Sequence, residues 1–216
     1  FHWCQGQYKS DTPKPAPGYV NFELYPDVRE YTTLFQTNLG NLGNGQPAKL
    51  FSSYTTQTVN KHFEWMRDYG IDGAAIQRFL STDGVFIANR DSIATKAKNA
   101  AEAYGRKFYI MYDITGLNSS TFVSQVQQDW SNVVTGSLNL TTSSAYARQN
   151  GKPVVCIWGI GFTDRPGDVN QCLSLINWFK SQGCYVIGGV PTNWRTCTSD
   201  SKPGFENVYR AFDMIS

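Results

Sequence analysis

The sequence predicts an α/β fold built on a parallel β-sheet, and three observations support that prediction. Apolar, strand-like segments alternate with amphipathic helical segments, and a glycine follows nearly every helix. The strand-like segments are almost continuously apolar, which is typical of parallel strands covered on both faces. Polar and aromatic residues gather where these segments end. The fold is therefore either a doubly wound sheet or a (β/α)8 TIM-type barrel, and we expect one barrel domain over residues 1–216.

The first fifty residues show little regular pattern. Residues 1–17 are expected to form a loop that contains the proline-rich segment "DTPKPAPG", and "YVNFELYP" (19–26) a short strand. Residues 33–49 are rich in Gly and Asn and are expected to form an irregular loop.

Two helices are expected in the first half of the chain. Thr55 or Thr56 caps the first, and Gly70 follows it at the position typical of a C-cap. Its apolar face, with spacings of four and three residues, consists of Val59, Phe63 and Met66. The second helix is expected to begin at Asp91 and to end before Gly105. Its apolar face consists of Ile93, Ala97, Ala100 and Tyr104.

Two further helices are expected in the second half. One carries Phe122, Val126, Trp130 and Val133 and continues in broken form to residue 148. Asp168 caps the other, and Gly183 follows it. The inward face of this last helix consists of Cys172, Leu175, Ile176 and Phe179.

The parallel strands are expected near residues 71–79, 107–114, 153–162, 184–190 and 208–215. One of them, "KFYIMYD", is apolar almost throughout and ends in Asp113. A carboxylate is costly to bury unless it is paired or hydrogen-bonded. We therefore expect this strand to open into a cleft at its carboxyl end, although Asp113 has an alternative role as a cap for the following loop.

Carboxylates, arginines and flat aromatic rings stand at the predicted strand ends, and these are the groups that sugars need. The expected catalytic acids are Asp113 and Asp213, and a partner for Asp113 outside the chain is the alternative to Asp213. The expected substrate-binding residues are Arg78, Tyr112, Trp158, Trp194 and Arg195. Glycoside cleavage uses a pair of carboxyl groups that flank the bond, so hydrolysis of a glycosidic bond fits this set.

Other function classes find no support. The net charge is +2 and no basic run exists, so nucleic acid is not an expected partner. No apolar stretch approaches the roughly 18 residues that span a membrane. No G-x-G-x-x-G or phosphate-binding loop follows a strand, so no cofactor is expected. No metal is expected either, because His2 and His62 are the only histidines and His62 falls on a helix among polar residues.

The five cysteines are odd in number, so at least one is expected to be free or to pair outside the chain. Cys156 lies inside an apolar strand and is expected to be buried and unpaired. Cys4 and Cys197 lie in loops and are the better candidates for a disulfide. Low Lys and Glu content, with many Ser, Thr, Asn and Tyr residues, favours secretion.

Five segments carry a resemblance to a known group of proteins: "YVNFELYPDVREY", "HFEWMRDYGIDGAAIQRF", "AAEAYGRKFYIMYDITG", "VVCIWGIGFTDRPG" and "GCYVIGGVPTNWR". They resemble fungal and bacterial proteins named xylosidase/arabinosidase, which are similar to the endo-α-mannosidases of glycoside hydrolase family ninety-nine. The resemblance runs from Phe1 to Ser216 and is weaker to the mannosidases. It implies a (β/α)8 barrel that acts on a cell-wall polysaccharide or glycan.

The resemblance to the mannosidases is incomplete at the acids. Aligning "KFYIMYDI" with the His-x-Glu-Pro-Tyr motif places Asp113 at the first Glu, but the second acid of that family falls on Gly116. Tyr25-Pro26-Asp27 is similar to a Tyr-Pro-Glu motif, and Trp158 falls on an aromatic position. The departure at Gly116 supports an alternative, which is a lectin-like protein on a degenerate hydrolase barrel.

The resemblance also implies that a first strand and the last strands lie outside the chain, which would hold about six of the eight strands of a barrel. The open edges of such a sheet favour self-association.

Overall fold

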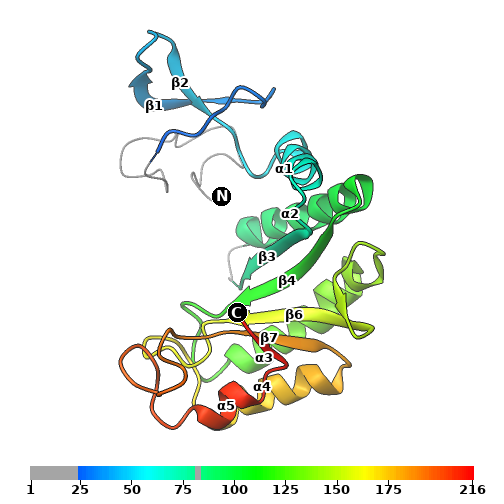
Figure 1. Cartoon of the computed structure of the whole chain (residues 1–216), viewed down its shortest axis with the longest axis vertical. Coiled ribbons are helices and arrows are strands. Elements are labelled where there is room, and N and C mark those ends of the chain that lie inside the picture. The colour runs from blue at the N-terminus through cyan, green and yellow to red at the C-terminus, as the bar shows by residue number, and fades with distance from the viewer. Residues whose placement is uncertain (1–23, 81–83) are drawn as a thin grey trace. The chain divides into compact units, whose positions relative to one another are not determined.

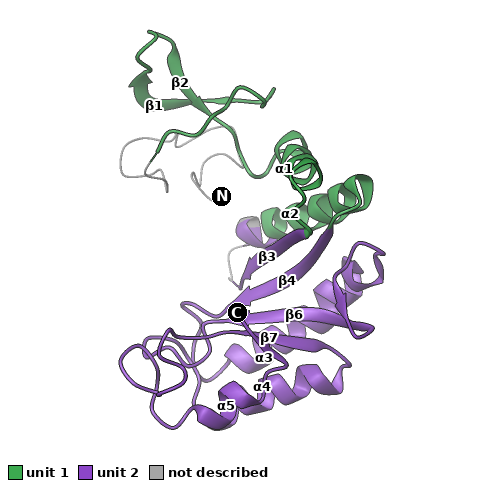
Figure 2. Cartoon of the chain, in the orientation of Figure 1, with its two compact units in different colours: residues 1–72, 88–106 green, residues 73–87, 107–216 purple. Residues whose placement is uncertain are grey.

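The computed structural model describes residues 24–80 and 84–216. They form two compact units (Figure 2): an N-terminal unit, made of the residues up to Asp72 and of Ala88–Arg106, and a sheet unit, made of Gly73–Ile87 and Lys107–Ser216. The expectation of one domain over residues 1–216 stays a prediction, and the expected 19–26 strand and residues 1–17 lie largely or wholly outside the described residues.

The N-terminal unit contains an antiparallel hairpin of β1 (Phe35–Asn41) and β2 (Pro47–Leu50), shown in Figure 1. The expectation of an irregular loop over residues 33–49 is therefore wrong. Its Gly and Asn residues concentrate in the turn between the strands, where the Leu42 amide donates to the Gln46 carbonyl at 2.8 Å. The hairpin leads into a small core of Tyr31, Leu50 and Phe51.

Helix α1 (Thr56–Asp68) begins and ends as the sequence predicts. The Thr55 hydroxyl accepts from the Thr58 amide, and Val59 and Phe63 are buried. Gly70 follows with φ of 70°, a conformation that favours glycine. Helix α2 (Gly84–Tyr104) begins seven residues before the expected cap at Asp91. The Asp91 carboxylate instead accepts from the side chain of Arg90 at 3.1 Å.

The sheet unit contains five parallel strands in the order β3, β4, β6, β7, β8. Their bounds are Gly73–Phe79, Lys107–Asp113, Lys152–Trp158, Tyr185–Gly189 and Met214–Ile215. A two-residue strand, β5 (Arg148–Gln149), pairs antiparallel with β6. Each new strand is added on the same side of the sheet, without the reversal of order that defines a doubly wound sheet. The unit is thus a mixed α/β structure with a mostly parallel sheet, and its described strands do not close into a barrel.

Helices α3 (Phe122–Asp129) and α4 (Val169–Ser181) pack on one face of this sheet (Figure 1). Asp168 forms a capping box with Gln171 at the start of α4. The expected inward residues of α4, all fully buried, are Cys172, Leu175, Ile176 and Phe179. Helix α3 continues as a π-helix, η2 (Trp130–Ser137), and a 3-10 turn, η3 (Leu140–Thr142). This confirms the broken continuation, but it ends at Thr142 and not at residue 148, where β5 begins.

The last expected strand, over residues 208–215, is largely wrong. A short helix, α5 (Glu206–Arg210), precedes the two-residue strand β8. The buried residues of this segment recur at helical rather than strand spacing: Phe205, Val208, Tyr209 and Phe212.

Cys156 lies in β6, is only 1% exposed and is unpaired, as expected. Cys197 is also buried and free, so it is not in a disulfide, and Cys4 lies outside the described residues.

Candidate functional site

The candidate site lies at the carboxyl end of the parallel sheet, where four strands end in register. The pairing places four residues in one row across β3, β4, β6 and β7: Phe79, Asp113, Trp158 and Gly189. Residues paired in register in a parallel sheet point to the same face, and successive residues of a strand point to opposite faces. Asp113 and Trp158 are therefore neighbours on one face, which we call the Asp113 face.

The Asp113 carboxylate is held by three hydrogen bonds. Its Oδ2 accepts from Gln77 Nε2 at 2.7 Å, and its Oδ1 accepts from the Thr115 amide at 2.9 Å and the Thr115 hydroxyl at 2.5 Å. Asp113 is only 4% exposed, whereas Gln77 is exposed. The acid therefore satisfies its bonding within the protein, as a loop cap does, and one of its partners, Gln77, is exposed.

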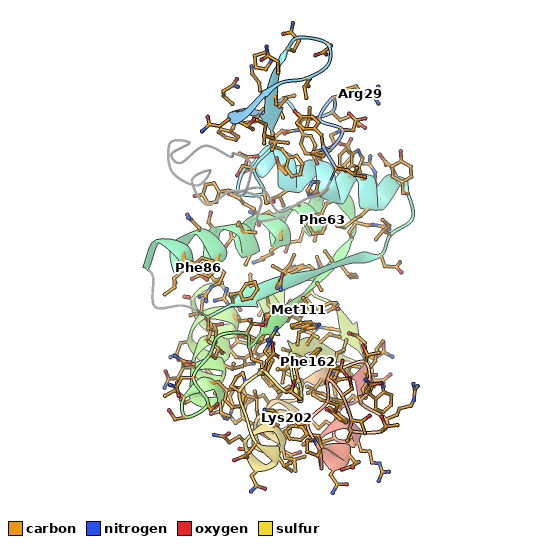
Figure 3. All side chains as sticks on the ribbon, turned by 90° about the vertical axis from the view of Figure 1, so that its left-hand side faces the viewer. Arg29, Phe63, Phe86, Met111, Phe162 and Lys202 are labelled. Carbon is orange, nitrogen blue, oxygen red and sulfur yellow. The ribbon has the colours of Figure 1, made fainter. Side chains whose placement is uncertain are left out.

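A second row on the Asp113 face lies beneath the first and is mostly apolar. It consists of Gln77, Met111, Cys156 and Ile187, and Met111 is labelled in Figure 3. Burial raises the pKa of the Cys156 thiol to about 12, so the thiol is uncharged at neutral pH. The floor of the candidate site thus carries no charge.

Trp158 forms an aromatic platform beside Asp113. Its ring lies 5.2 Å from the ring of Phe162, and the Arg165 guanidinium lies 5.7 Å from the Trp158 centroid, within cation–π range. Gly189 makes room for the indole, because a Cβ at this position would lie 2.2 Å from Trp158 Cδ1. Trp158 is half-buried, so part of the residue is accessible to a ligand.

Two loops that follow β6 and β7 are tied together at this end of the sheet. The Thr163 amide donates to the Asp200 carbonyl at 3.2 Å, and the Lys202 amide donates to the Gly161 carbonyl at 2.8 Å. Lys202 Nζ also donates to the Arg165 carbonyl at 2.7 Å. These bonds hold the loop that carries Phe162 and Arg165 in place.

Trp194 and Arg195 lie in the loop after β7. The Arg195 guanidinium stacks 4.5 Å from the Trp194 centroid, and Trp194 packs edge-on against Tyr209 at 6.3 Å. The Asp200 carboxylate holds this loop by accepting from the amides of Thr192 and Asn193. Although desolvation raises the pKa of Asp200, these bonds outweigh it and the pKa lies below its usual value. This loop follows the same end of the sheet as Asp113, but no described contact joins Trp194 or Arg195 to it.

Arg78 and Tyr112 do not join the candidate site. Both point to the helix-covered face, because each is adjacent in sequence to a residue of the Asp113 face. Arg78 is 1% exposed and binds Asp129 through two bonds, Nε to Oδ2 at 2.6 Å and Nη2 to Oδ1 at 2.7 Å. The Tyr112 hydroxyl donates to the same carboxylate at 2.8 Å. Desolvation raises the pKa of Tyr112 well above its usual value, so it stays protonated.

Asp213 also lies apart from Asp113. It precedes β8, and its carboxylate accepts from the Val186 amide at 2.8 Å and pairs with Lys180 at 3.0 Å. Val186 is the second residue of β7, whereas the row of Asp113 meets β7 at its last residue, Gly189. The expected position at a carboxyl strand end fails because the strand begins at Met214 instead of containing Asp213 near its end.

The structure adds Gln77, Phe162 and Arg165 to the candidate site. Two residues of a strand point to the same face when they are two positions apart, so Gln77 and Phe79 share the face of their partners Met111 and Asp113. This two-residue period is the feature of the sequence that indicates that Gln77 lies on the same face as Asp113. Phe162 and Arg165 lie in a loop, where no such period applies.

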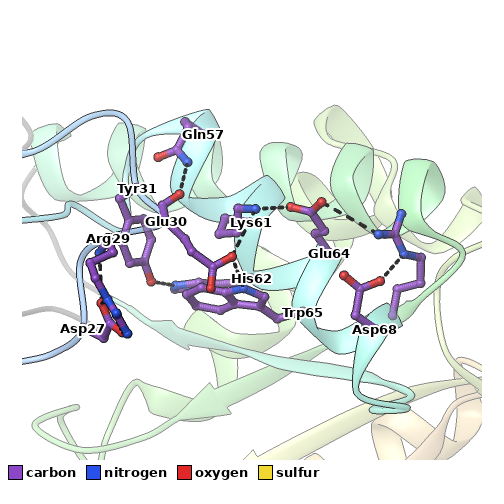
Figure 4. Close-up of polar contacts among 11 residues, drawn as sticks. Asp27, Arg29, Glu30, Tyr31, Gln57, Lys61, His62, Glu64, Trp65 and Asp68 are labelled. Carbon is purple, nitrogen blue, oxygen red and sulfur yellow. Dashed lines mark hydrogen bonds and ion pairs between the residues drawn. The ribbon is translucent and has the colours of Figure 1, made fainter.

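The N-terminal unit has a hollow of its own, with a volume of about 630 Å³. It is lined mainly by apolar and aromatic side chains that include Tyr31, Phe51 and Trp65. Figure 4 shows how their polar atoms are engaged: the Tyr31 hydroxyl contacts His62 Nε2 at 2.7 Å, and Trp65 Nε1 donates to Glu30 at 3.2 Å. Burial lowers the pKa of His62 to about 4, so the ring is neutral at pH 7.

Within the described ranges, no group of three or more His, Cys, Asp or Glu side chains is arranged to hold a metal ion. A search of those residues also finds no helix that is long and apolar enough to cross a membrane.

No family model matches the chain, and no curated protein matches it. Among solved structures, the chain aligns with one named "Glycoside hydrolase-like protein", with a TM-score of 0.48 and 14% sequence identity. The alignment covers 77% of this chain and 49% of that one, so the chain spans about half the length of that structure.

Proposed function

We propose that the sheet unit binds carbohydrate at the carboxyl end of its strands and cleaves a glycosidic bond there. The observation that carries this proposal is the pairing of Asp113 with Trp158 in one row of the Asp113 face. A half-buried indole offers a flat apolar surface to a sugar ring, and a carboxylate beside it offers the reacting group that glycoside hydrolysis requires. Arg165 adds a donor of hydrogen bonds at the rim of the platform.

We also propose that the sheet is part of a (β/α)8 barrel, with the Asp113 face toward its axis. The strands follow one another in sequence order, and the side chains of the Asp113 face form successive rows, as the interior layers of such a barrel do. Active sites of these barrels form at the carboxyl ends of the strands, which is where Asp113 lies. Secretion and self-association stay predictions for this chain.

The proposal is tested by hydrolysis of a panel of aryl glycosides and cell-wall polysaccharides. Asp113→Asn should keep the fold and lower the rate by about 10²–10⁴, the usual effect of losing a general acid or base. Asp72→Asn is the matched control, because Asp72 is an exposed acid that precedes the first residue of β3, at the opposite end of the strand from the candidate site. Undiminished activity in Asp113→Asn would mean that the acid is only a structural cap.

A lectin-like function is the second candidate, and the bonding of Asp113 favours it. Both carboxylate oxygens already accept hydrogen bonds from the protein, as expected for a structural acid. In that case the wild-type protein would hydrolyse none of the panel but would bind glycans, and Trp158→Ala would weaken the binding. Wild-type turnover of any glycoside would exclude this second candidate.

A further inference from the structure

Arg165 is held at the edge of the aromatic platform by packing and by its backbone. Its guanidinium lies 5.7 Å from the Trp158 ring centroid and 5.9 Å from the Phe162 centroid. Its aliphatic stem passes close to Gly159, where a Cβ would lie 3.5 Å from Arg165 Cγ. Its carbonyl accepts from Lys202 Nζ at 2.7 Å, and Phe162 and Lys202 are both labelled in Figure 3. A positive charge is thus fixed beside Trp158 before any ligand binds.

The protein uses only part of the bonding capacity of this guanidinium. Nη1 donates to the Asp164 carboxylate, whose side chain is 70% exposed. Among the residues that the structure describes, neither Nε nor Nη2 of Arg165 has an acceptor. An ion pair with so exposed an acid contributes little, so a ligand carboxylate can take the place of Asp164. The Arg165 side chain is itself 18% exposed, so a ligand can reach it in part.

The other cations of the neighbouring loops have different partners. Lys202 Nζ donates to the carbonyls of Arg165 and Gly167, both at 2.7 Å. Arg195 stacks on Trp194, and no described contact joins that pair to the platform. Arg165 is therefore the one cation that the described contacts place on the platform. A single planar guanidinium suits a singly charged, planar carboxylate better than a phosphate dianion.

We propose that the sugar bound on the Asp113 face is a uronic acid and that Arg165 binds its carboxylate. This inference rests on the proposed carbohydrate site. A sugar ring stacked on Trp158 places its substituents at the rim of the indole, where the guanidinium lies. A uronic acid carries a carboxylate where a neutral hexose carries a hydroxymethyl group, so Arg165 distinguishes the two by charge.

The first measurement compares sugars that contain a uronic acid (uronides) with their own carboxyl-reduced forms. The probes are oligogalacturonides and xylo-oligosaccharides substituted with glucuronic acid, and titration calorimetry measures their binding. Each uronide should bind about tenfold to a hundredfold more tightly than its reduced form, as expected for hydrogen bonds between charged groups. This preference should shrink as salt is added, because salt screens the attraction. Equal affinity for the two forms would overturn the inference.

The variants test whether Arg165 is the source of that preference. Arg165→Met keeps an aliphatic stem beside Trp158 and should abolish the preference, whereas Arg165→Lys keeps the charge and should retain part of it. Asp164→Asn removes the acid that competes for the guanidinium and should increase the preference. Arg148→Met is the matched control, because Arg148 is exposed on β5, beside the first residues of β6. An unchanged preference in Arg165→Met would overturn the inference.

The outcomes separate this inference from the proposed hydrolysis. The preference is a ratio measured within one protein, so a partial loss of folded protein does not alter it. Selective binding of uronides through Arg165 without cleavage would support the inference and refute only the hydrolysis. Cleavage of neutral glycosides with no preference for uronides would support the hydrolysis and overturn the inference. Tighter binding of a sulfated galactan than of either uronide would also overturn it, because the ligand would then not be a carboxylate.

Discussion

The two faces of the parallel sheet hold similar chemical groups in different settings. On the helix-covered face, Arg78, Tyr112 and Asp129 form a network in which all three residues are buried. On the Asp113 face, the acid bonds to Gln77, which is exposed. The two networks are built from adjacent residues of β3 and β4, so a single step along each strand separates them.

The difference shows how the setting of a charged group indicates its role. A buried guanidinium–carboxylate pair has its charges neutralised within the core, and removing one partner leaves the other uncompensated. Asp113 is itself only 4% exposed, but the described groups that bond to it are neutral, and one of them, Gln77, is exposed. We therefore assign Arg78, Tyr112 and Asp129 to stability and Asp113 to the candidate site.

The largest effect on stability is expected from Arg78→Met, which leaves the Asp129 carboxylate in the core without the positive charge of Arg78. The free energy of unfolding should fall by about 3–5 kcal/mol, as for other broken buried ion pairs. The double variant Arg78→Met/Asp129→Leu should recover much of this loss, because it leaves no buried charge. Urea unfolding of the wild type, the single variant and the double variant measures both changes in unfolding free energy. A loss below about 1 kcal/mol in the single variant would contradict the prediction, because that is the contribution of a solvent-exposed ion pair.

A smaller effect is expected from two adjacent glycines of β7 that serve opposite faces. A Cβ at Gly188 would lie 2.6 Å from the Phe212 ring, and a Cβ at Gly189 would lie 2.2 Å from Trp158 Cδ1. Each Gly→Ala change should cost about 1–3 kcal/mol through overpacking. Only Gly189→Ala should also alter glycan binding, because only it displaces the aromatic platform. Equal binding defects in both variants would remove the distinction between the faces.

The smallest effect is expected for the thiols. Cys156 lies on the Asp113 face and Cys172 in α4, yet both are buried and burial raises the pKa of each to about 12. Neither should react with a thiol reagent at pH 8 in the folded protein, and both should react after unfolding. Rapid labelling of Cys156 alone would show that the candidate site extends down to the second row.

The sequence predicts the helices better than it predicts the directions of the side chains on the strands. Caps and helical spacing located α1 and α4, because Thr55, Asp168 and the residues at four- and three-residue intervals act locally. In strands that are apolar on both faces, composition does not distinguish the faces. Composition alone therefore groups Arg78 and Tyr112 with Asp113, although strand parity places them on the opposite face.

Two other errors have separate physical causes. The β1–β2 hairpin was missed because its turn residues dominated the composition of the segment. Asp213 was misplaced because the 205–212 segment is apolar enough for a strand, and only its three- and four-residue spacing reveals the helix α5. The contact of Arg165 with Trp158 depends on the path of a loop, which no periodic pattern encodes.

The most direct test of the account compares Asp113→Asn with Asp129→Asn, the same substitution on the two faces. Unfolding free energy and glycoside turnover are measured for both. Asp129→Asn should lower stability by about 3–5 kcal/mol. Asp113→Asn should cost about 1.5–3 kcal/mol, because its hydrogen bonds have a charged acceptor, and should lower turnover by about 10²–10⁴. The assignment of Asp113 to the candidate site is contradicted if Asp113→Asn destabilises the protein as much as Asp129→Asn does and leaves turnover by the remaining folded protein unchanged.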